Sequence, residues 1–281
     1  MTVPESWTCP TCSSTVSTPY CPGCGESLPS ARDLTLRGLC ELLVRAFINI
    51  DSRLIRSFRY LVTRPGSLTL AYVQGQRRPF IGPLQLFLIA NVLFFAIQSG
   101  TNANVVSSQL DSHLHNQDWS ALAQRLVSQR VEGLKTTIDA YAPAFNRAVV
   151  LHAKSFIILM TLPFAILLQL MFHRNRQPFV AHAVFSLHFY AFLLLVFCVS
   201  LALAAVDASL GGAGLNSPRM DHILSVINLV ACATYLYIAT GTVYSASGAF
   251  RMIKVLGLAL FVAGILLGYR FVLFLITLYT T

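Results

Sequence analysis

Charged residues are scarce in this chain, and their scarcity excludes most classes of soluble protein. Only 11% of the 281 residues are charged, whereas 55% are hydrophobic. Ordinary soluble domains contain about 25% charged residues. The mean hydropathy is +0.64, so the composition predicts an integral membrane protein.

A secretory signal is also lacking. Met1 to Thr8 contains neither a basic region nor an apolar core, so we expect the residues that follow to stay in a reducing compartment. The sequence contains no Walker loop, no nucleophile elbow and no paired carboxylates within an apolar stretch. It therefore predicts architecture more directly than activity.

Five apolar stretches have the length needed to cross about 30 Å of hydrocarbon. They cover approximately residues 80–98, 151–172, 180–205, 223–245 and 255–279. We therefore expect an all-α membrane protein with a bundle of about five transmembrane helices. This transmembrane domain covers residues 79–281 and includes an external loop at 99–149.

Basic residues are distributed unevenly around these stretches. Nine Lys or Arg residues precede the first stretch, two lie between the second and third, and two lie between the fourth and fifth. The opposite side carries five, nearly balanced by acidic residues. Because Lys and Arg accumulate in cytoplasmic segments, we expect a cytoplasmic N-terminus and an external C-terminus. The net charge of +9 is then explained by topology, and we expect no nucleic-acid partner.

Four cysteines near the N-terminus form two Cys-x-x-Cys pairs, Cys9 with Cys12 and Cys21 with Cys24. This spacing lets all four thiolates bind one tetrahedral metal ion. We expect structural zinc, because nothing suggests redox work, although the same sulfurs can hold iron. A reducing compartment disfavours disulfides. Residues 1–30 are thus predicted to form a zinc ribbon whose closed site leaves no open position for a substrate.

The two Cys-x-x-Cys knuckles of this ribbon differ in the residue that follows the second cysteine. Gly25 follows the last cysteine, where a left-handed backbone is expected. Ser13 occupies the corresponding place after Cys12. We therefore expect the first knuckle to be the less regular one.

A basic amphipathic helix is predicted between Asp33 and Val62, within a cytoplasmic segment at 31–78. Its apolar positions are Leu39, Leu43, Phe47, Ile50, Leu54, Phe58 and Leu61, and the arginines opposite are Arg37, Arg45, Arg53, Arg56 and Arg59. We expect this interfacial helix to place its arginines near anionic lipid headgroups of the bilayer. Packing of its apolar face on the bundle is the alternative, and the two can coexist. Arg64-Pro65-Gly66 should end the helix.

Several motifs together resemble a known family. The double knuckle is followed by a basic helix, by Arg-Pro-Gly at 64–66 and by Gly-Gln-Arg-Arg-Pro-Phe-Ile-Gly-Pro at 75–83. His-Ala-Val-Phe-Ser-Leu-His-Phe-Tyr-Ala-Phe follows at 182–192. This series resembles the bacterial zinc-ribbon membrane proteins grouped as domain of unknown function 3667, except over the loop at 99–149. The resemblance implies a multi-pass protein of the bacterial inner membrane, and it implies no activity, substrate or catalytic residue.

Polar residues within the apolar stretches are candidates for function, because they are costly in lipid. His182 and His188 lie about 120° apart around one helix, which argues against a shared metal ion. A polar intramembrane site containing His182, His188, Tyr237, Thr240 and Tyr244 is one hypothesis, and hydrogen bonds that pack helices are the favoured alternative. In the external loop, His113 and His115 lack a third ligand, so we expect a solvated loop there.

Two functional hypotheses follow. The first is a non-enzymatic adaptor, regulator or assembly factor whose ribbon docks a cytoplasmic protein. The second is a lipid- or small-molecule-handling enzyme or transporter that uses the polar site near His182 and His188. The sequence favours the first and supplies no catalytic residue.

Overall fold

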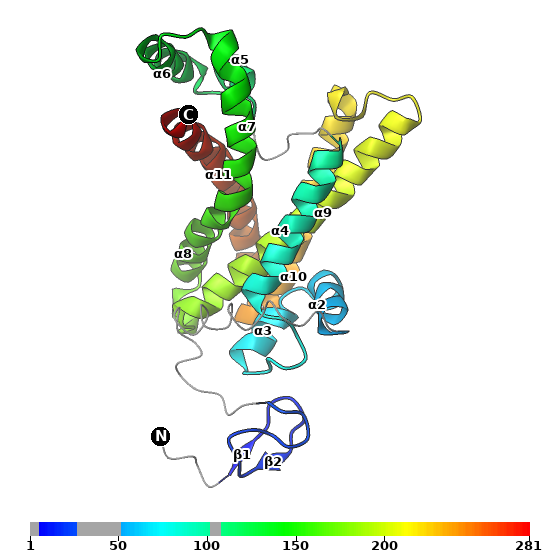
Figure 1. Cartoon of the computed structure of the whole chain (residues 1–281). Coiled ribbons are helices and arrows are strands. Elements are labelled where there is room, and N and C mark those ends of the chain that lie inside the picture. Colours follow the sequence, from blue (N-terminus) through cyan, green and yellow to red (C-terminus); the bar gives the residue numbers. More distant parts are fainter. Residues whose placement is uncertain (1–5, 27–51, 102–107) are drawn as a thin grey trace.

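The computed structural model describes residues 6–26, 52–101 and 108–281. These ranges are mostly helical, with one two-stranded hairpin near the N-terminus (Figure 1). The strands are β1 (Trp7–Thr8) and β2 (Thr15–Val16). The α-helices are α2 (Ser52–Thr63), α3 (Ser67–Val73), α4 (Pro83–Thr101), α5 (Leu110–His115), α6 (Ser120–Gly133), α7 (Ile138–Phe156), α8 (Thr161–Met171), α9 (Phe179–Ser209), α10 (Pro218–Tyr244) and α11 (Gly248–Thr280). Short 3₁₀ turns are η2 (Ile157–Met160), η3 (His173–Asn175) and η4 (Gly214–Asn216).

Five helical segments in the described ranges are long and apolar enough to cross a membrane. They are Pro83–Thr101, Ile138–Met171, Phe179–Ser209, Arg219–Tyr244 and Gly248–Thr280. The second joins α7 to α8 through η2. These segments support a multi-pass membrane protein, as the composition predicted.

Helix α9 is the centre of the bundle. Helices α4 and α8 pack along it, while α10 packs against both α9 and α11, and α11 also contacts α7. Figure 1 shows α4, α9 and α10 in one arm and α7 and α11 in another, and the arms diverge away from α2 and α3. Aromatic side chains fill the contacts of α9, such as Phe189 against Phe164 of α8, with ring centroids 4.9 Å apart.

The second membrane segment begins earlier than the sequence predicted. The helix was expected near residue 151, after an external loop, but α7 begins at Ile138. The Thr137 hydroxyl caps it by accepting a hydrogen bond from the amide of Ala140, at 3.3 Å. An apolar stripe at intervals of four residues is buried along the first part of α7. Its members are Tyr141, Phe145 and Val149.

The expectation of a solvated loop at His113 is wrong. Helices α5 and α6 pack on α7, and His113 is only 1% exposed. Its ring centroid lies 4.8 Å from that of Phe274 on α11, and Trp119 Nε1 donates to its Nδ1 at 3.2 Å. His115 does remain exposed, beside Asp111. We call helices α5 and α6 the cap.

Helix α2 is the described part of the predicted amphipathic helix. Residues 27–51, which include Arg37 and Arg45, lie outside the described residues. The helix ends at Thr63, because Pro65 disfavours helical geometry in the residue before it. Leu61 is buried in the core of the bundle, with Leu54 and Phe58 packed against that core.

Gly66 allows α3 to begin directly against α10. Its φ of 85° is in the left-handed region, and a Cβ atom there would lie 2.9 Å from both Cα and O of Ala239. Helix α3 contacts α9 as well as α10. The Arg64-Pro65-Gly66 turn therefore fixes how the first described helices meet the bundle.

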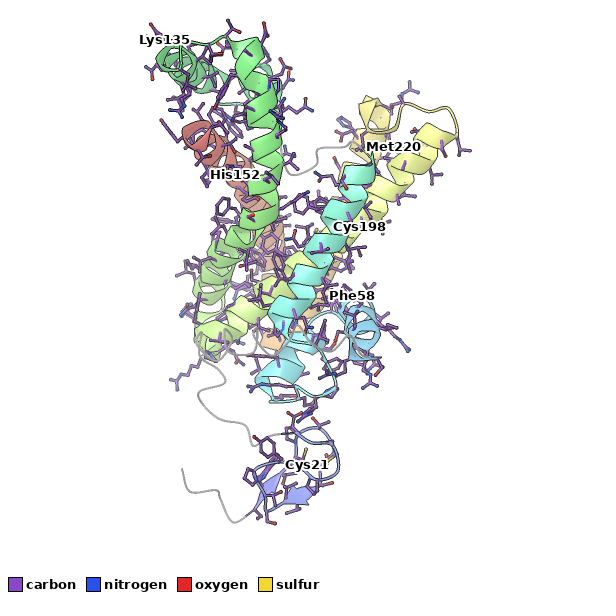
Figure 2. The ribbon with its side chains drawn as sticks, in the orientation of Figure 1. Cys21, Phe58, Lys135, His152, Cys198 and Met220 are labelled. Atoms are coloured by element: carbon purple, nitrogen blue, oxygen red, sulfur yellow. The ribbon has the colours of Figure 1, made fainter. Side chains whose placement is uncertain are left out.

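Polar side chains satisfy helix carbonyls at the end of the bundle near α3. Lys254 Nζ donates to the Met171 carbonyl at the end of α8, at 2.7 Å. Asn175 Nδ2 donates to the Tyr244 carbonyl at the end of α10, also at 2.7 Å. These bonds satisfy groups that a helix terminus leaves unpaired. We call this end of the molecule the ribbon end, and Figure 2 shows Cys21 there and Lys135 at the opposite end.

We expect Gly66→Ala to lower the free energy of unfolding in detergent by about 2–4 kcal/mol, because the new methyl group meets the α10 backbone in a left-handed conformation. Thermal unfolding of the full chain measures this. Gly264→Ala is the matched control, since nothing lies within 4 Å of its added Cβ. Equal effects of the two substitutions would contradict the close contact with α10.

We also expect the cap to loosen as the pH falls from about 6.5 to about 4. Burial, and then the charge of Arg270, lower the pKa of His113 to about 4, whereas an exposed histidine titrates near 6.5. Between these two pH values the unfolded state binds a proton that the folded state does not. The free energy of unfolding therefore decreases as the pH decreases. Above about pH 6.5 the residue adds no pH dependence.

Fluorescence of Trp119 in a Trp7→Phe background reports this transition. His113→Phe should flatten the profile between these two pH values, whereas His115→Gln should leave it unchanged. A profile that is the same with and without His113 would refute its role.

Candidate metal centre and intramembrane polar contacts

Two turns of the same form carry the four cysteines. Ser13 N donates to the Cys9 carbonyl at 2.8 Å, and Gly25 N donates to the Cys21 carbonyl at 2.7 Å. Ser13 has a φ of 58° and Gly25 a φ of 70°. The serine thus adopts the left-handed backbone that was expected of glycine, and the first turn is as regular as the second.

The four cysteine sulfurs converge. All lie within 4.8 Å of one another, and two pairs, Cys9 with Cys24 and Cys12 with Cys21, are separated by 3.4 Å. A tetrahedral ion with metal–sulfur bonds of about 2.3 Å separates its sulfurs by about 3.8 Å, so the donor set fits one metal ion.

Few apolar side chains surround this centre. Trp7 and Val16, opposite each other in the hairpin, form a small buried cluster with Cys9 and Cys21. Trp7 Nε1 also donates to the Thr18 carbonyl at 2.8 Å. Because so small a core stabilises little by itself, a bound metal ion would supply much of the folding free energy of the ribbon.

Glu26 joins the ribbon to the loop between α3 and α4. Its side chain is only 2% exposed. Its Oε2 accepts hydrogen bonds from the Thr11 hydroxyl at 2.8 Å and from the backbone amides of Arg77 and Arg78 at 3.2 and 3.0 Å. Sequence analysis missed this residue, although it is one of two acidic residues among the first 30.

The same loop contacts both knuckles. Gln76 Nε2 donates to the Pro10 carbonyl in the first knuckle at 2.7 Å. The Arg78 guanidinium lies over Gly25 in the second, 3.4 Å from where a Cβ would be. These loop residues belong to the motif at 75–83, so the structure gives that motif a role in holding the ribbon.

His188 bonds α3. Its Nδ1 lies 2.9 Å from the hydroxyl oxygen of Thr69, and both residues are buried. Thr240, another residue of the predicted polar site, donates its hydroxyl to the Leu236 carbonyl in its own helix, at 2.8 Å. The His188–Thr69 contact therefore joins α9 to α3.

His182 pairs with Tyr244. Its Nδ1 lies 2.8 Å from the Tyr244 hydroxyl, and Tyr244 also stacks on Phe172 with ring centroids 4.2 Å apart. Tyr237 instead contacts Arg251, whose guanidinium carbon lies 3.7 Å from the centroid of its ring. The structure thus brings His182 and Tyr244 of the predicted site together, whereas His188, Tyr237 and Thr240 each form a different contact.

Three of the five arginines expected near lipid headgroups lie in the described ranges. Arg56 and Arg59 are exposed on α2, and Arg53 is half-buried. Arg64, beyond the end of the helix, joins Arg56 and Arg59 around a hollow. Periodicity within the helix gave no signal for Arg64.

We expect Glu26→Ala to release the ribbon without removing a bound metal ion. The substitution deletes an acceptor for two loop amides but no sulfur ligand. Hydrogen exchange of the full chain in detergent should show at least about tenfold faster exchange at Arg77 and Arg78. Elemental analysis should show unchanged metal content. Glu132→Ala, at an exposed position of α6, is the control.

Cys21→Ser should lose both the metal ion and the protection of these amides. If Glu26→Ala lost as much metal as Cys21→Ser, the result would contradict a docking role for Glu26. Glu26 would then be needed for the fold of the ribbon itself.

Comparison with protein families gives a match at the ribbon end. The model described as Protein of unknown function (DUF3667) matches residues 51–95. These residues comprise α2, α3, the loop that holds the ribbon and part of α4. No curated protein and no solved structure matches the chain. The resemblance noted from the sequence is confirmed over residues 51–95, and the description of this family carries no activity.

Proposed function

We propose that this integral membrane protein is a non-enzymatic adaptor, regulator or assembly factor whose zinc ribbon docks a cytoplasmic protein. The observation that carries the proposal is the attachment of the ribbon through Glu26. One side of the ribbon is held on the membrane helices, and the side with the hairpin faces away from α3 (Figure 1).

Zinc is the metal that suits this role. Four thiolates complete a tetrahedral coordination shell, which leaves no site for a substrate and supports a structural ion. Two of the ligands, Cys9 and Cys21, are buried. When bound, the ion would fix both knuckles and thereby hold Glu26 in position for the loop.

The exposed surface of the ribbon has the character of a protein-binding surface. It contains hydroxyl-bearing side chains such as Thr8 and Thr15, together with Tyr20, which is 63% exposed. Met1 to Ser30 contains no Lys or Arg, so it has none of the positive charge that nucleic-acid binding requires. Tyrosine is enriched at protein interfaces, which favours a protein partner.

We propose that the ribbon end faces the cytoplasm of a bacterial cell and that the protein resides in the inner membrane. Arg174 and Arg176 lie in and after η3, and Arg251 and Lys254 lie in the first turns of α11. Asn175 and Lys254 bond the ends of α10 and α8, and this end of α10 meets Gly66 at the start of α3, so these residues lie at the ribbon end. The cap at the other end mixes acidic and basic residues. This asymmetry supports a cytoplasmic ribbon by the positive-inside rule.

A photo-crosslinking amino acid at position 20 of the full chain tests the adaptor proposal in intact cells. We expect a protein adduct of fixed mass, because Tyr20 lies on the proposed docking surface. The adduct should disappear in Cys21→Ser, which loses the metal site. The same amino acid at Leu134, 44% exposed on the cap side, should give no such adduct.

Substitutions in the membrane separate the two functional hypotheses. The adaptor proposal predicts that His182→Phe and His188→Phe keep the adduct and leave cellular lipid composition unchanged. Thr69→Val breaks the His188 bond from its other side and controls for packing. If the histidine variants insert normally but change lipid composition or solute uptake, while Thr69→Val does not, the adaptor proposal is wrong.

A further inference from the structure

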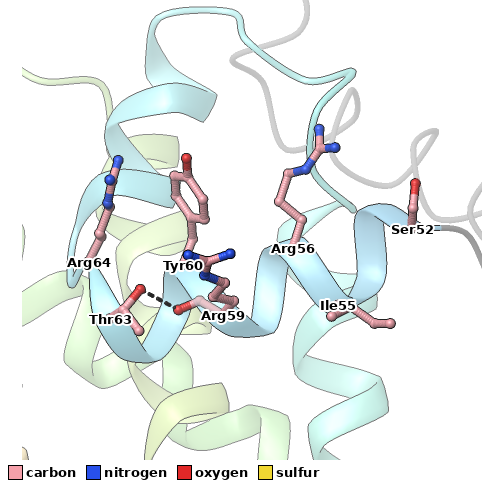
Figure 3. Close-up of a pocket in the computed structure, with 7 residues that line it drawn as sticks. All are labelled: Ser52, Ile55, Arg56, Arg59, Tyr60, Thr63 and Arg64. Atoms are coloured by element: carbon pink, nitrogen blue, oxygen red, sulfur yellow. Dashed lines mark hydrogen bonds between the residues drawn. The ribbon is translucent and has the colours of Figure 1, made fainter.

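The exposed side of α2 bears a basic hollow of about 360 Å³. It is shown in Figure 3 and is lined by Ser52, Ile55, Arg56, Arg59, Tyr60, Thr63 and Arg64. Three of these residues are arginines and none is acidic. The hollow therefore offers positive charge together with hydroxyl groups, which is the chemistry that binds a phosphate.

The arginines of the hollow are available to a ligand. Arg64 lies over the ring of Tyr60, with its guanidinium carbon 5.0 Å from the ring centroid. Arg56 and Arg59 are exposed, and neither forms an ion pair with an acidic residue in the described ranges. Thr63 donates its hydroxyl hydrogen to the Arg59 carbonyl, so the guanidinium groups, and not this hydroxyl, are the donors for a phosphate.

An apolar edge lies beside the hollow. Ile55 is 75% exposed and Val62 is 51% exposed. They are seven residues apart and so lie within about 20° of each other around the helix. By the same count, this edge separates the arginines from Phe58 on the packed face. Around α2, the packed face is followed by the exposed apolar edge and then by the arginines. This order of faces suits a helix at a membrane interface.

The position of α2 in the molecule suits the same partner. The helix contacts α3, α4 and α9 at the ribbon end, the end at which the membrane segments Pro83–Thr101 and Phe179–Ser209 begin (Figure 1). Headgroups would therefore lie at the level of this helix. A soluble anion would use the arginines but would have no contact for the exposed apolar edge.

We propose that this hollow binds the phosphate of an anionic glycerophospholipid, with the lipid's apolar part along Ile55 and Val62. Arg56, Arg59 and Arg64 contact the phosphate, and Tyr60 holds Arg64 in place. This proposal goes beyond the adaptor function and does not depend on it, because the ribbon contributes no residue to the hollow.

Binding of dioctanoyl phosphatidylglycerol to the full chain in a neutral detergent tests the proposal. We expect Arg56→Gln with Arg59→Gln to weaken binding about 25-fold, at about fivefold for each arginine near an anionic headgroup. Arg125→Gln with Lys135→Gln changes the net charge equally at exposed positions on the cap side and should leave binding unchanged. Equal weakening by both pairs would reduce the effect to net charge and overturn the proposal.

Two further binding measurements identify the ligand. Dioctanoyl phosphatidylcholine should bind at least about tenfold more weakly than phosphatidylglycerol, because its choline group opposes the arginines. Ile55→Ser with Val62→Ser should weaken phosphatidylglycerol binding without changing the binding of inorganic phosphate. If inorganic phosphate binds as tightly as the lipid, or if the serine pair has no effect on lipid binding, the lipid assignment is wrong.

Discussion

The buried carboxylate of Glu26 determines how the ribbon sits on the membrane helices. A carboxylate removed from water needs hydrogen bonds to offset its lost solvation. Here the donors come from both sides, the Thr11 hydroxyl within the ribbon and two backbone amides of the loop. Only the docked arrangement provides all three donors. Because Glu26 follows the second knuckle by two residues, the metal centre and the docking contact are mechanically coupled.

The ribbon end is also where polar contacts join the helices. Helices gain no hydrophobic stabilisation by leaving lipid for each other, so hydrogen bonds and close approach contribute much of their association. Thr69 with His188 joins α3 to α9, and Tyr244 with His182 joins α10 to α9. Gly66 brings α3 against α10 without a side chain between them. The arms diverge away from the ribbon end. At the opposite end, the cap packs on α7 and α11 (Figure 1).

These contacts bear on the function because they occupy groups that chemistry would otherwise use. His182 and His188 each have a protein partner at Nδ1, which favours a role in helix packing. Two surfaces of the described residues are open at the ribbon end, the hairpin side of the ribbon and the hollow on α2. One is nearly uncharged and the other strongly basic, so the two surfaces suit the two different partners proposed, a protein and a lipid.

The sequence by itself determined five stretches long and apolar enough to cross a membrane, four cysteines that can hold one metal ion, and the end of α2 before Pro65. These features depend on the runs, spacings and backbone geometry of residues near one another in the chain. Only the tertiary structure decided that His113 is buried, that α7 starts at Ile138 on a packed stripe, and that Glu26 binds the loop at Arg77. It also decided the partner of His188, since Thr69 is 119 residues away. The spacing and polarity of side chains along the sequence restrict the kind of partner that each one needs. The packing of distant segments selects the residue that becomes that partner.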